Sequence, residues 1–198
     1  MTTTGTKYLF AVISVPILIG TLLAVYLFYT KPSVPLFNQQ PTTNNQQLTN
    51  PGLPKRLVIP TIGVDAPVIN VGLTSSGAVD TPKGPSEVAW YQLGPRPGAE
   101  GSAVITGHFG TWRDGSGSVF DDLNKLKMGD KIYLKDDAGA ELVFKVIESK
   151  MYQPNQSPAE VFNKTGGAFL NLITCQGDWL ANQKTYNQRL VIFTELVK

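Results

Sequence analysis

Short segments in which hydrophobic and polar residues alternate fill the chain from residue 55 onward. They are rich in β-branched and aromatic residues and are separated by stretches containing Gly and Pro, which is typical of β-strands. The predicted strands are residues 56–62, 66–71, 88–91, 102–108, 131–134, 142–147, 168–175 and 189–196. Helical patterns are scarce, and only residues 119–126 and 158–162 are candidates. About eight strands of this kind predict a mostly-β domain built as a closed or nearly closed barrel with short helices.

A different pattern precedes the strands. Residues 8–29 are predominantly apolar and uncharged, and they lie between Lys7 and Lys31. As a helix this run would span roughly 33 Å, enough for the hydrocarbon core of a bilayer. No small-x-small cleavage site follows it, so it predicts an uncleaved anchor rather than a signal peptide. Residues 1–31 are therefore expected to form one transmembrane segment. The flanking charges barely set its orientation, and we favour an internal N-terminus with the rest of the chain outside the cytoplasm.

Residues 32–54 carry no charge and are crowded with Asn, Gln, Thr and Pro. Such a stretch has too few apolar groups to fold and predicts a flexible, disordered linker. Residues 55–198 then form the folded domain. Two of the 17 basic residues precede it, whereas all 15 acidic residues lie within it, so basic and acidic residues balance. This balance, without a basic tract, disfavours nucleic acid as a partner.

Three side chains at the ends of predicted strands are candidates for chemistry. Cys175, the only cysteine, ends one strand, and Gln176-Gly177-Asp178 is expected to break that strand. Arg189 begins the next strand, and an antiparallel hairpin would set the two residues opposite each other, roughly 5 Å apart at the backbone. His108, the only histidine, ends the strand of residues 102–108. Each residue alone is more often structural, but their joint position predicts a cysteine acyl-transfer site.

The three residue types suit that chemistry. A thiol is a weak nucleophile until it ionises, and a neighbouring cation favours the thiolate. His108 can protonate a departing amine and later deprotonate an incoming one. The guanidinium of Arg189 is always charged and rigidly forked, which suits an oxyanion or a substrate backbone.

The segment Leu172-Ile173-Thr174-Cys175 resembles the Thr-Leu-x-Thr-Cys signature of the sortases, membrane-anchored transpeptidases of bacterial cell surfaces. One departure is Leu170-Asn171-Leu172, where the family often shows a threonine at the first motif position and this chain has Asn171 or Leu172. The resemblance covers nearly all of residues 55–198 and is most similar to the class F branch. Further matching segments are Leu57-Val58-Ile59-Pro60, Ile62-Gly63-Val64, Trp90-Tyr91, Pro97-Gly98, residues 103–108, residues 119–126 and Met128-Gly129-Asp130.

This resemblance implies an eight-stranded sortase-type barrel and a two-step reaction. Cys175 would attack a C-terminal sorting motif of a secreted protein and form a thioacyl intermediate. An amine, from a peptidoglycan precursor or a pilin lysine, would then resolve it, with His108 and Arg189 as the other catalytic residues. The enzyme would be a single-pass protein of the cell membrane that uses no cofactor. No metal constellation is visible, since the chain has one His and one Cys.

Two other readings stay open. An L,D-transpeptidase-like or other cell-wall cysteine hydrolase also needs Cys, His and Arg, but those enzymes typically place the arginine two residues after the cysteine, where this chain has Gly177. A non-enzymatic wall-binding β-domain would require the three residues to be coincidental. The expected long loop 176–188 holds Trp179, and Trp112 follows the histidine; the two tryptophans either wall an apolar pocket or pack at the barrel rim.

Overall fold

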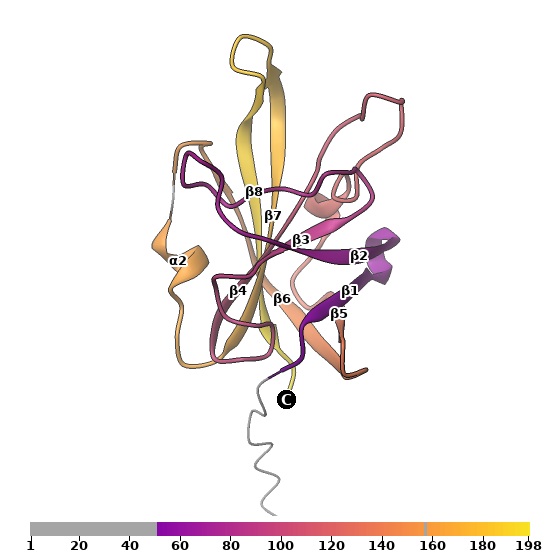
Figure 1. The fold of residues 1–198 in the computed structure, drawn as a ribbon, viewed down its shortest axis with the longest axis vertical. Helices are drawn as coiled ribbons and strands as arrows, with labels where there is room; N and C mark the ends of the chain where they lie inside the picture. The colour runs from indigo at the N-terminus through magenta and orange to yellow at the C-terminus, as the bar shows by residue number, and fades with distance from the viewer. Residues whose placement is uncertain (1–50, 157) are drawn as a thin grey trace, which may run out of the picture. The chain divides into compact units, whose positions relative to one another are not determined.

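A closed barrel of eight β-strands forms the described part of the chain (Figure 1). The computed structural model describes residues 51–156 and 158–198. The strands are β1 Pro54–Ile59, β2 Val64–Val71, β3 Val88–Tyr91, β4 Gly101–Gly107, β5 Lys131–Asp136, β6 Glu141–Tyr152, β7 Ala168–Leu180 and β8 Thr185–Leu196. The short helices are η1 Pro60–Ile62, η2 Leu123–Lys125 and α2 Ala159–Phe162. The predicted mostly-β barrel is confirmed.

The strand order around the barrel is β1-β2-β3-β4-β7-β8-β6-β5. The β2–β3 and β4–β7 pairs are parallel, and the other neighbours are antiparallel. Strand β7 therefore lies between β4 and β8, although β4 and β7 are far apart in the sequence. This topology brings the end of β4 to the strands that carry the predicted cysteine and arginine.

Side chains along the central strands alternate between the inner and the outer face of the barrel. Leu170 and Leu172 of β7 lie in the barrel interior, within the main hydrophobic core. The intervening residues of β7 point outward, because successive side chains of a strand alternate between faces. Outside the barrel a second buried cluster forms, and α2 covers it. Its buried members are Val104, Val161, Val191 and Phe193.

The break expected at Gln176-Gly177-Asp178 was wrong. Strand β7 continues to Leu180, and its register with β8 shifts between Gln176 and Trp179. Gly177 has a φ of 83°, which strains any residue with a side chain, and a Cβ there would lie 2.1 Å from Oδ1 of Asn187, so glycine is strongly favoured. The glycine thus marks a β-bulge within a long hairpin rather than a strand end. The expected long loop 176–188 is reduced to the turn of residues 181–184.

The predicted helix of residues 119–126 is also wrong in extent, since only the 3₁₀ turn η2 forms there. The second candidate, residues 158–162, coincides with α2.

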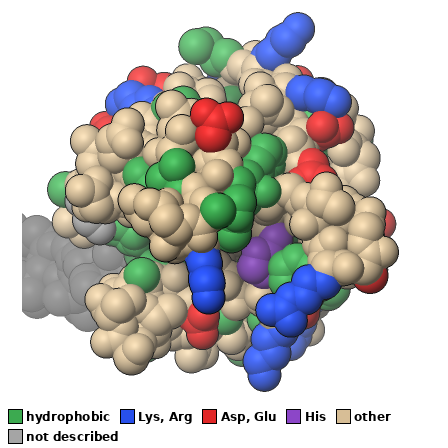
Figure 2. All heavy atoms as spheres, turned by 90° about the horizontal axis from the view of Figure 1, so that it is seen from above, with side chains coloured by type: hydrophobic (Ala, Val, Ile, Leu, Met, Phe, Trp, Pro, Cys, Tyr) green, Lys and Arg blue, Asp and Glu red, His purple; other side chains and the backbone are tan. Residues whose placement is uncertain are grey.

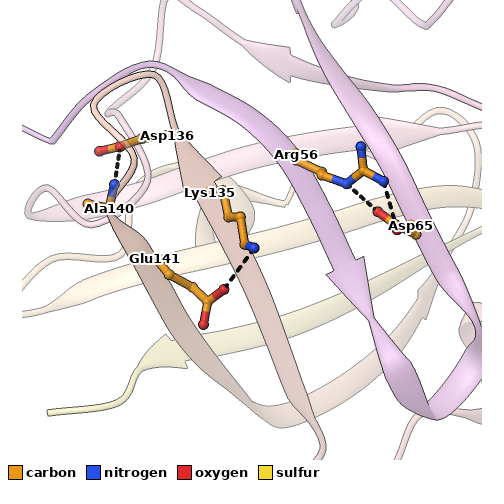
Figure 3. Close-up of polar contacts among 6 residues, drawn as sticks. All are labelled: Arg56, Asp65, Lys135, Asp136, Ala140 and Glu141. Atoms are coloured by element: carbon orange, nitrogen blue, oxygen red, sulfur yellow. Dashed lines mark hydrogen bonds and ion pairs between the residues drawn. The ribbon is translucent and has the colours of Figure 1, made fainter.

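Ion pairs on the outer surface join neighbouring strands, as Figure 3 shows for Arg56 with Asp65 and for Lys135 with Glu141.

The end of the expected linker belongs to the folded domain. The amide of Gly52 donates to Oδ2 of Asp136 at 3.0 Å, and the amide of Leu53 donates to Oδ1 of Asp137 at 2.8 Å. Strand β1 then begins at Pro54, within the stretch assigned to the linker. The expected transmembrane segment and the rest of the linker lie outside the described residues. Within the described residues, no helix has the length and apolar character needed to cross a membrane.

Candidate active site

Cys175 and Arg189 are directly opposed on the antiparallel pair β7–β8, which confirms the predicted register. Leu172 and Ile192 on the same strands lie in the barrel interior. Odd-numbered residues of both strands therefore point outward, and the thiol and the arginine side chain share the outer face. The long hairpin projects beyond the barrel (Figure 1), and Cys175 and Arg189 lie along its course rather than at its tip.

His108 directly follows β4, the strand on the other side of β7. Thr106 pairs with Ile173, and the hydroxyl of Thr174 donates to the carbonyl oxygen of Gly107 at 2.8 Å. His108 follows Gly107, and Cys175 follows Thr174, so this hydrogen bond joins the residues that immediately precede the histidine and the cysteine. Parallel strands lie about 4.8 Å apart, so the topology brings the histidine backbone alongside the cysteine.

The connection between β2 and β3 fixes the histidine ring. Nε2 of His108 lies 2.7 Å from the carbonyl oxygen of Pro82, and the hydroxyl of Thr106 donates to the carbonyl of Asp80 at 3.1 Å. Both side chains therefore meet the same segment on the outer face. A carbonyl oxygen only accepts, so Nε2 carries the proton in this contact and Nδ1 is the basic nitrogen of the neutral ring. The ring also packs against Trp112, with centroids 4.8 Å apart.

A cleft of about 660 Å³ opens beside the cysteine on the outer face. Cys175, Arg189 and Ile173 line it, whereas His108 does not. Hydrophobic side chains from three connecting segments supply the walls. Examples are Leu73, Val79, Leu93, Pro95 and Phe162. Figure 2 views the molecule from the hairpin end and shows hydrophobic side chains gathered around a hollow on this face.

The guanidinium of Arg189 is turned along its own strand. Nη1 donates to the carbonyl oxygens of Tyr186 at 3.0 Å and Gln188 at 2.9 Å, and Nη2 donates to the hydroxyl of Thr185 at 2.8 Å. A guanidinium has five N–H donors, so these three contacts fix its plane without using all of its donors. The arginine is thereby held in place at the edge of the cleft.

Two features of the surroundings of Cys175 shift the pKa of its thiol in opposite directions. Burial raises the pKa of the thiol above its ordinary value, and the positive charge of Arg189 lowers it by a smaller amount. At neutral pH the sulfur is therefore protonated, and a base must take the proton when the sulfur attacks an electrophile.

The two tryptophans do not wall the cleft. Trp112 packs on the histidine ring, and Trp179 packs on Tyr186 with ring centroids 5.2 Å apart. Tyr186 in turn packs against Phe109, at 5.1 Å, which ties the loop after β4 to the hairpin. Within residues 51–156 and 158–198, no group of three or more His, Cys, Asp or Glu side chains is placed to hold a metal ion.

Sequence reasoning missed the contacts that hold the candidate site. Pro82 contacts the histidine from 26 residues away, and no local pattern signals that contact. Thr174 was quoted only as part of a motif, but its buried hydroxyl links β7 to the end of β4.

Residues 57–197 match the family model of the sortase domain. This match covers well over half of the chain. The chain belongs to the sortase family. Membership in this family makes it a cysteine transpeptidase, as the resemblance of residues 172–175 implied. No curated protein sequence shows a significant match.

Solved sortase structures share the fold. Sortase C-1 from Actinomyces oris is 26% identical, with a TM-score of 0.57, over 72% of this chain and 73% of that one. The Group B Streptococcus Pilus Island 1 sortase C2 is 25% identical, with a TM-score of 0.55, over 73% of each chain. Sortase A from Corynebacterium diphtheriae, at 22% identity and a TM-score of 0.55, covers 75% of this chain and 62% of its own and shows the fold alone. None of these three is named as class F, so the class F assignment stays a prediction.

Proposed function

We propose that this sortase joins a sorting-motif peptide to an amine, with Cys175 as nucleophile, His108 as proton carrier and Arg189 as oxyanion or backbone donor. One observation carries the proposal. The cysteine and the arginine are opposed on β7 and β8 and line a cleft, and the histidine follows the end of β4, the strand beside β7. Acyl transfer needs these three groups together, whereas a binding domain does not.

The first step forms the thioacyl bond. The sulfur of Cys175 attacks the carbonyl carbon of the scissile peptide bond, and its proton passes to Nδ1 of His108. The negative charge that develops on the carbonyl oxygen is stabilised by N–H groups of Arg189 that its contacts with β8 leave free. Collapse of the tetrahedral species breaks the C–N bond, and His108 returns the proton to the leaving amine.

The second step runs the same chemistry in reverse. The incoming amine attacks the thioester carbonyl and gives a proton to His108, the C–S bond breaks, and the sulfur leaves as a thiolate that is reprotonated from His108. Protons and electron pairs therefore balance without a cofactor. The raised pKa of the Cys175 thiol makes a dedicated proton acceptor necessary.

The position of the cleft supports an assignment of the two parts of the substrate. The leaving amine must reach His108, which does not line the cleft, so the acyl portion lies in the cleft beside Cys175 and Ile173. We assign the acyl donor to secreted proteins with a C-terminal sorting motif, and the acceptor to a peptidoglycan precursor or a pilin amine. The enzyme is placed in the cell membrane as a single-pass protein, anchored by residues 8–29, with the barrel outside the cytoplasm. That placement is supported by the length and composition of this segment.

The test is a transpeptidation assay with the purified full chain. A panel of sorting-motif peptides is mixed with a short amine-bearing peptide, and the ligated product is followed by chromatography and mass spectrometry. We expect a new amide between the two peptides, and no product with Cys175→Ala. Cleavage that yields only the free acid, whatever the amine, would instead support a cysteine hydrolase. No reaction with any peptide of the panel would overturn the proposal.

A further inference from the structure

The histidine loop, defined as residues 109–120, is closed at its base by one carboxylate. Oδ1 of Asp121 accepts a hydrogen bond from the amide of Gly110 at 2.6 Å, and Oδ2 accepts one from the amide of Ser118 at 2.8 Å. The hydroxyl of Ser118 donates to the carbonyl oxygen of Gly110 at 2.6 Å. Three hydrogen bonds therefore join the two ends of the loop through Asp121 and Ser118.

Backbone hydrogen bonds make the loop a compact unit that starts from this base. The amide of Phe120 donates to the carbonyl oxygen of His108 at 3.1 Å, which fixes the loop to the end of β4. Nearer the tip, the amide of Trp112 donates to the carbonyl oxygen of Ser116 at 2.8 Å. The two arms of the loop are thus bonded to each other, and the position of Trp112 follows from the closure at Asp121.

Trp112 is the loop residue that packs on the histidine ring. Its ring and the imidazole of His108 have centroids 4.8 Å apart and planes inclined at 54°. The carbonyl oxygen of Pro82 lies 2.7 Å from Nε2 of the same imidazole. The ring is therefore restrained at one nitrogen and on one face, and Nδ1 is left as the basic nitrogen. Because a turn of the ring would exchange the two nitrogens, the contact with Trp112 preserves this orientation.

We propose that Asp121 is a positioning residue for His108 and acts on it through the histidine loop and Trp112. The role rests on the function proposed above, in which Nδ1 of His108 carries the proton. Asp121 keeps the loop closed, the closed loop keeps Trp112 on the imidazole, and Trp112 keeps Nδ1 oriented for both proton transfers. Those transfers occur in the transition states, so loss of the orientation lowers kcat and kcat/KM together and leaves the donor KM unchanged.

The neighbouring residue Asp122 offers a matched control. Its side chain is 49% exposed and pairs with Lys125 at 2.8 Å, a kind of ion pair that contributes little to stability. Asp121→Asn keeps the shape of the side chain but turns one of its two acceptors into a donor, so the side chain cannot accept from both amides. Asp122→Asn makes the same chemical change one residue away and should have no effect on the histidine.

The single histidine of the chain makes the test direct, because every imidazole signal belongs to His108. The full chain without a histidine tag is studied by proton NMR of the imidazole C–H groups, with a two-bond proton–nitrogen spectrum to identify the tautomer. An indole shifts the signals of protons beside its ring, and Trp112→Leu gives their unshifted positions. We expect Asp121→Asn to move the signals most of the way to those positions, and Asp122→Asn to leave them unchanged.

The same variants are compared for kcat, donor KM and Tm in transpeptidation, at a temperature where all of them are folded. We expect Asp121→Asn to lower kcat about 10-fold with the donor KM within about 2-fold, since a misplacement of about 1 Å between reacting groups can reduce the rate by about 10²-fold. Asp121→Asn combined with Trp112→Leu should be no slower than Trp112→Leu alone, because both changes act through one contact. A merely structural role would lower only Tm.

Imidazole signals that stay at their wild-type positions in Asp121→Asn would overturn the proposal, and so would moved signals with an unchanged kcat. Equal effects in Asp122→Asn would show a general response to the lost charge and would overturn it too. If Asp121→Asn does not fold, Ser118→Ala, which removes the hydroxyl bond to Gly110, decides the question by the same criteria. Absence of turnover in the wild-type chain would overturn the proposed function and the catalytic role inferred from it, whereas the NMR signals would still show whether Asp121 holds Trp112 on the ring.

Discussion

Thr174 offers the sharpest test of how the fold brings the site together. Its side chain is 2% exposed, and its hydroxyl donates to the carbonyl oxygen of Gly107 at 2.8 Å. The two bonded residues immediately precede Cys175 and His108. The substitution Thr174→Val keeps the β-branched shape and removes only the hydroxyl, so it should loosen the link between β7 and the end of β4 with little change in volume.

The size of the effect follows from the burial of the bond. Loss of a buried hydrogen bond that leaves its acceptor without that partner costs about 1–3 kcal/mol. For a domain of this size, each kcal/mol corresponds to a change in Tm of about 2–4 °C, so Tm should fall by about 2–12 °C. The value of kcat/KM should also fall, and by more than the loss of stability explains, because the variant is assayed where it is folded. A misplacement of about 1 Å between reacting groups can reduce the rate by about 10²-fold, and we expect kcat/KM to fall at least 10-fold.

The assay compares Tm and kcat/KM for Thr174→Val and Thr194→Val at a temperature where both are folded. The control removes a hydroxyl of the same kind, bonded to the carbonyl of Leu170 at 2.6 Å, away from the site. We expect similar losses of Tm and a loss of kcat/KM only in Thr174→Val. Equal kcat/KM in the two variants would refute the idea that the bond to Gly107 positions the histidine beside the cysteine.

Two further predictions concern the charge beside the Cys175 thiol and the packing of Gly107, the residue before His108. Because the positive charge of Arg189 lowers the pKa of the Cys175 thiol, Arg189→Ala should move the inflection of the pH–alkylation profile upward, and an unchanged or lower inflection would argue against that contact. Gly107→Ala would place a Cβ 2.4 Å from the buried ring of Phe120 and should cost about 1–3 kcal/mol in thermal or urea unfolding. Gly72→Ala, where nothing lies within 4 Å, should melt like the wild type, and equal melting of both variants would contradict the packing argument.

The barrel and the pairing across the hairpin could be predicted because they depend on local pattern. Alternation defines each strand and its inward face, and an antiparallel hairpin sets Cys175 opposite Arg189 once both strands are found. His108 was grouped with them because it too ends a predicted strand, but the pattern does not show that this strand pairs with β7, because the parallel pair β4–β7 joins segments more than 60 residues apart.

The remaining features depend on contacts that no local pattern encodes. Gly177 was interpreted as a strand end, because a glycine in a bulge and a glycine in a turn look alike until the partner strand is known. The orientation of Arg189 toward Thr185 and the contact of His108 with Pro82 are set by the tertiary fold. The start of the domain was placed too late, at residue 55. The preceding residues have no apolar pattern and are held instead by the carboxylates of β5 and the turn after it, as at Gly52.

The mass of the enzyme itself tests the central claim, a thioacyl intermediate on Cys175, most directly. The full chain is mixed with a reactive sorting-motif peptide without an amine acceptor, quenched in acid and analysed intact by mass spectrometry. We predict an adduct equal to the acyl portion of the peptide, located on Cys175, the only cysteine, released by hydroxylamine and absent from Cys175→Ala. Peptide cleavage at a normal rate with no such adduct, or an adduct that persists in Cys175→Ala, would contradict the account.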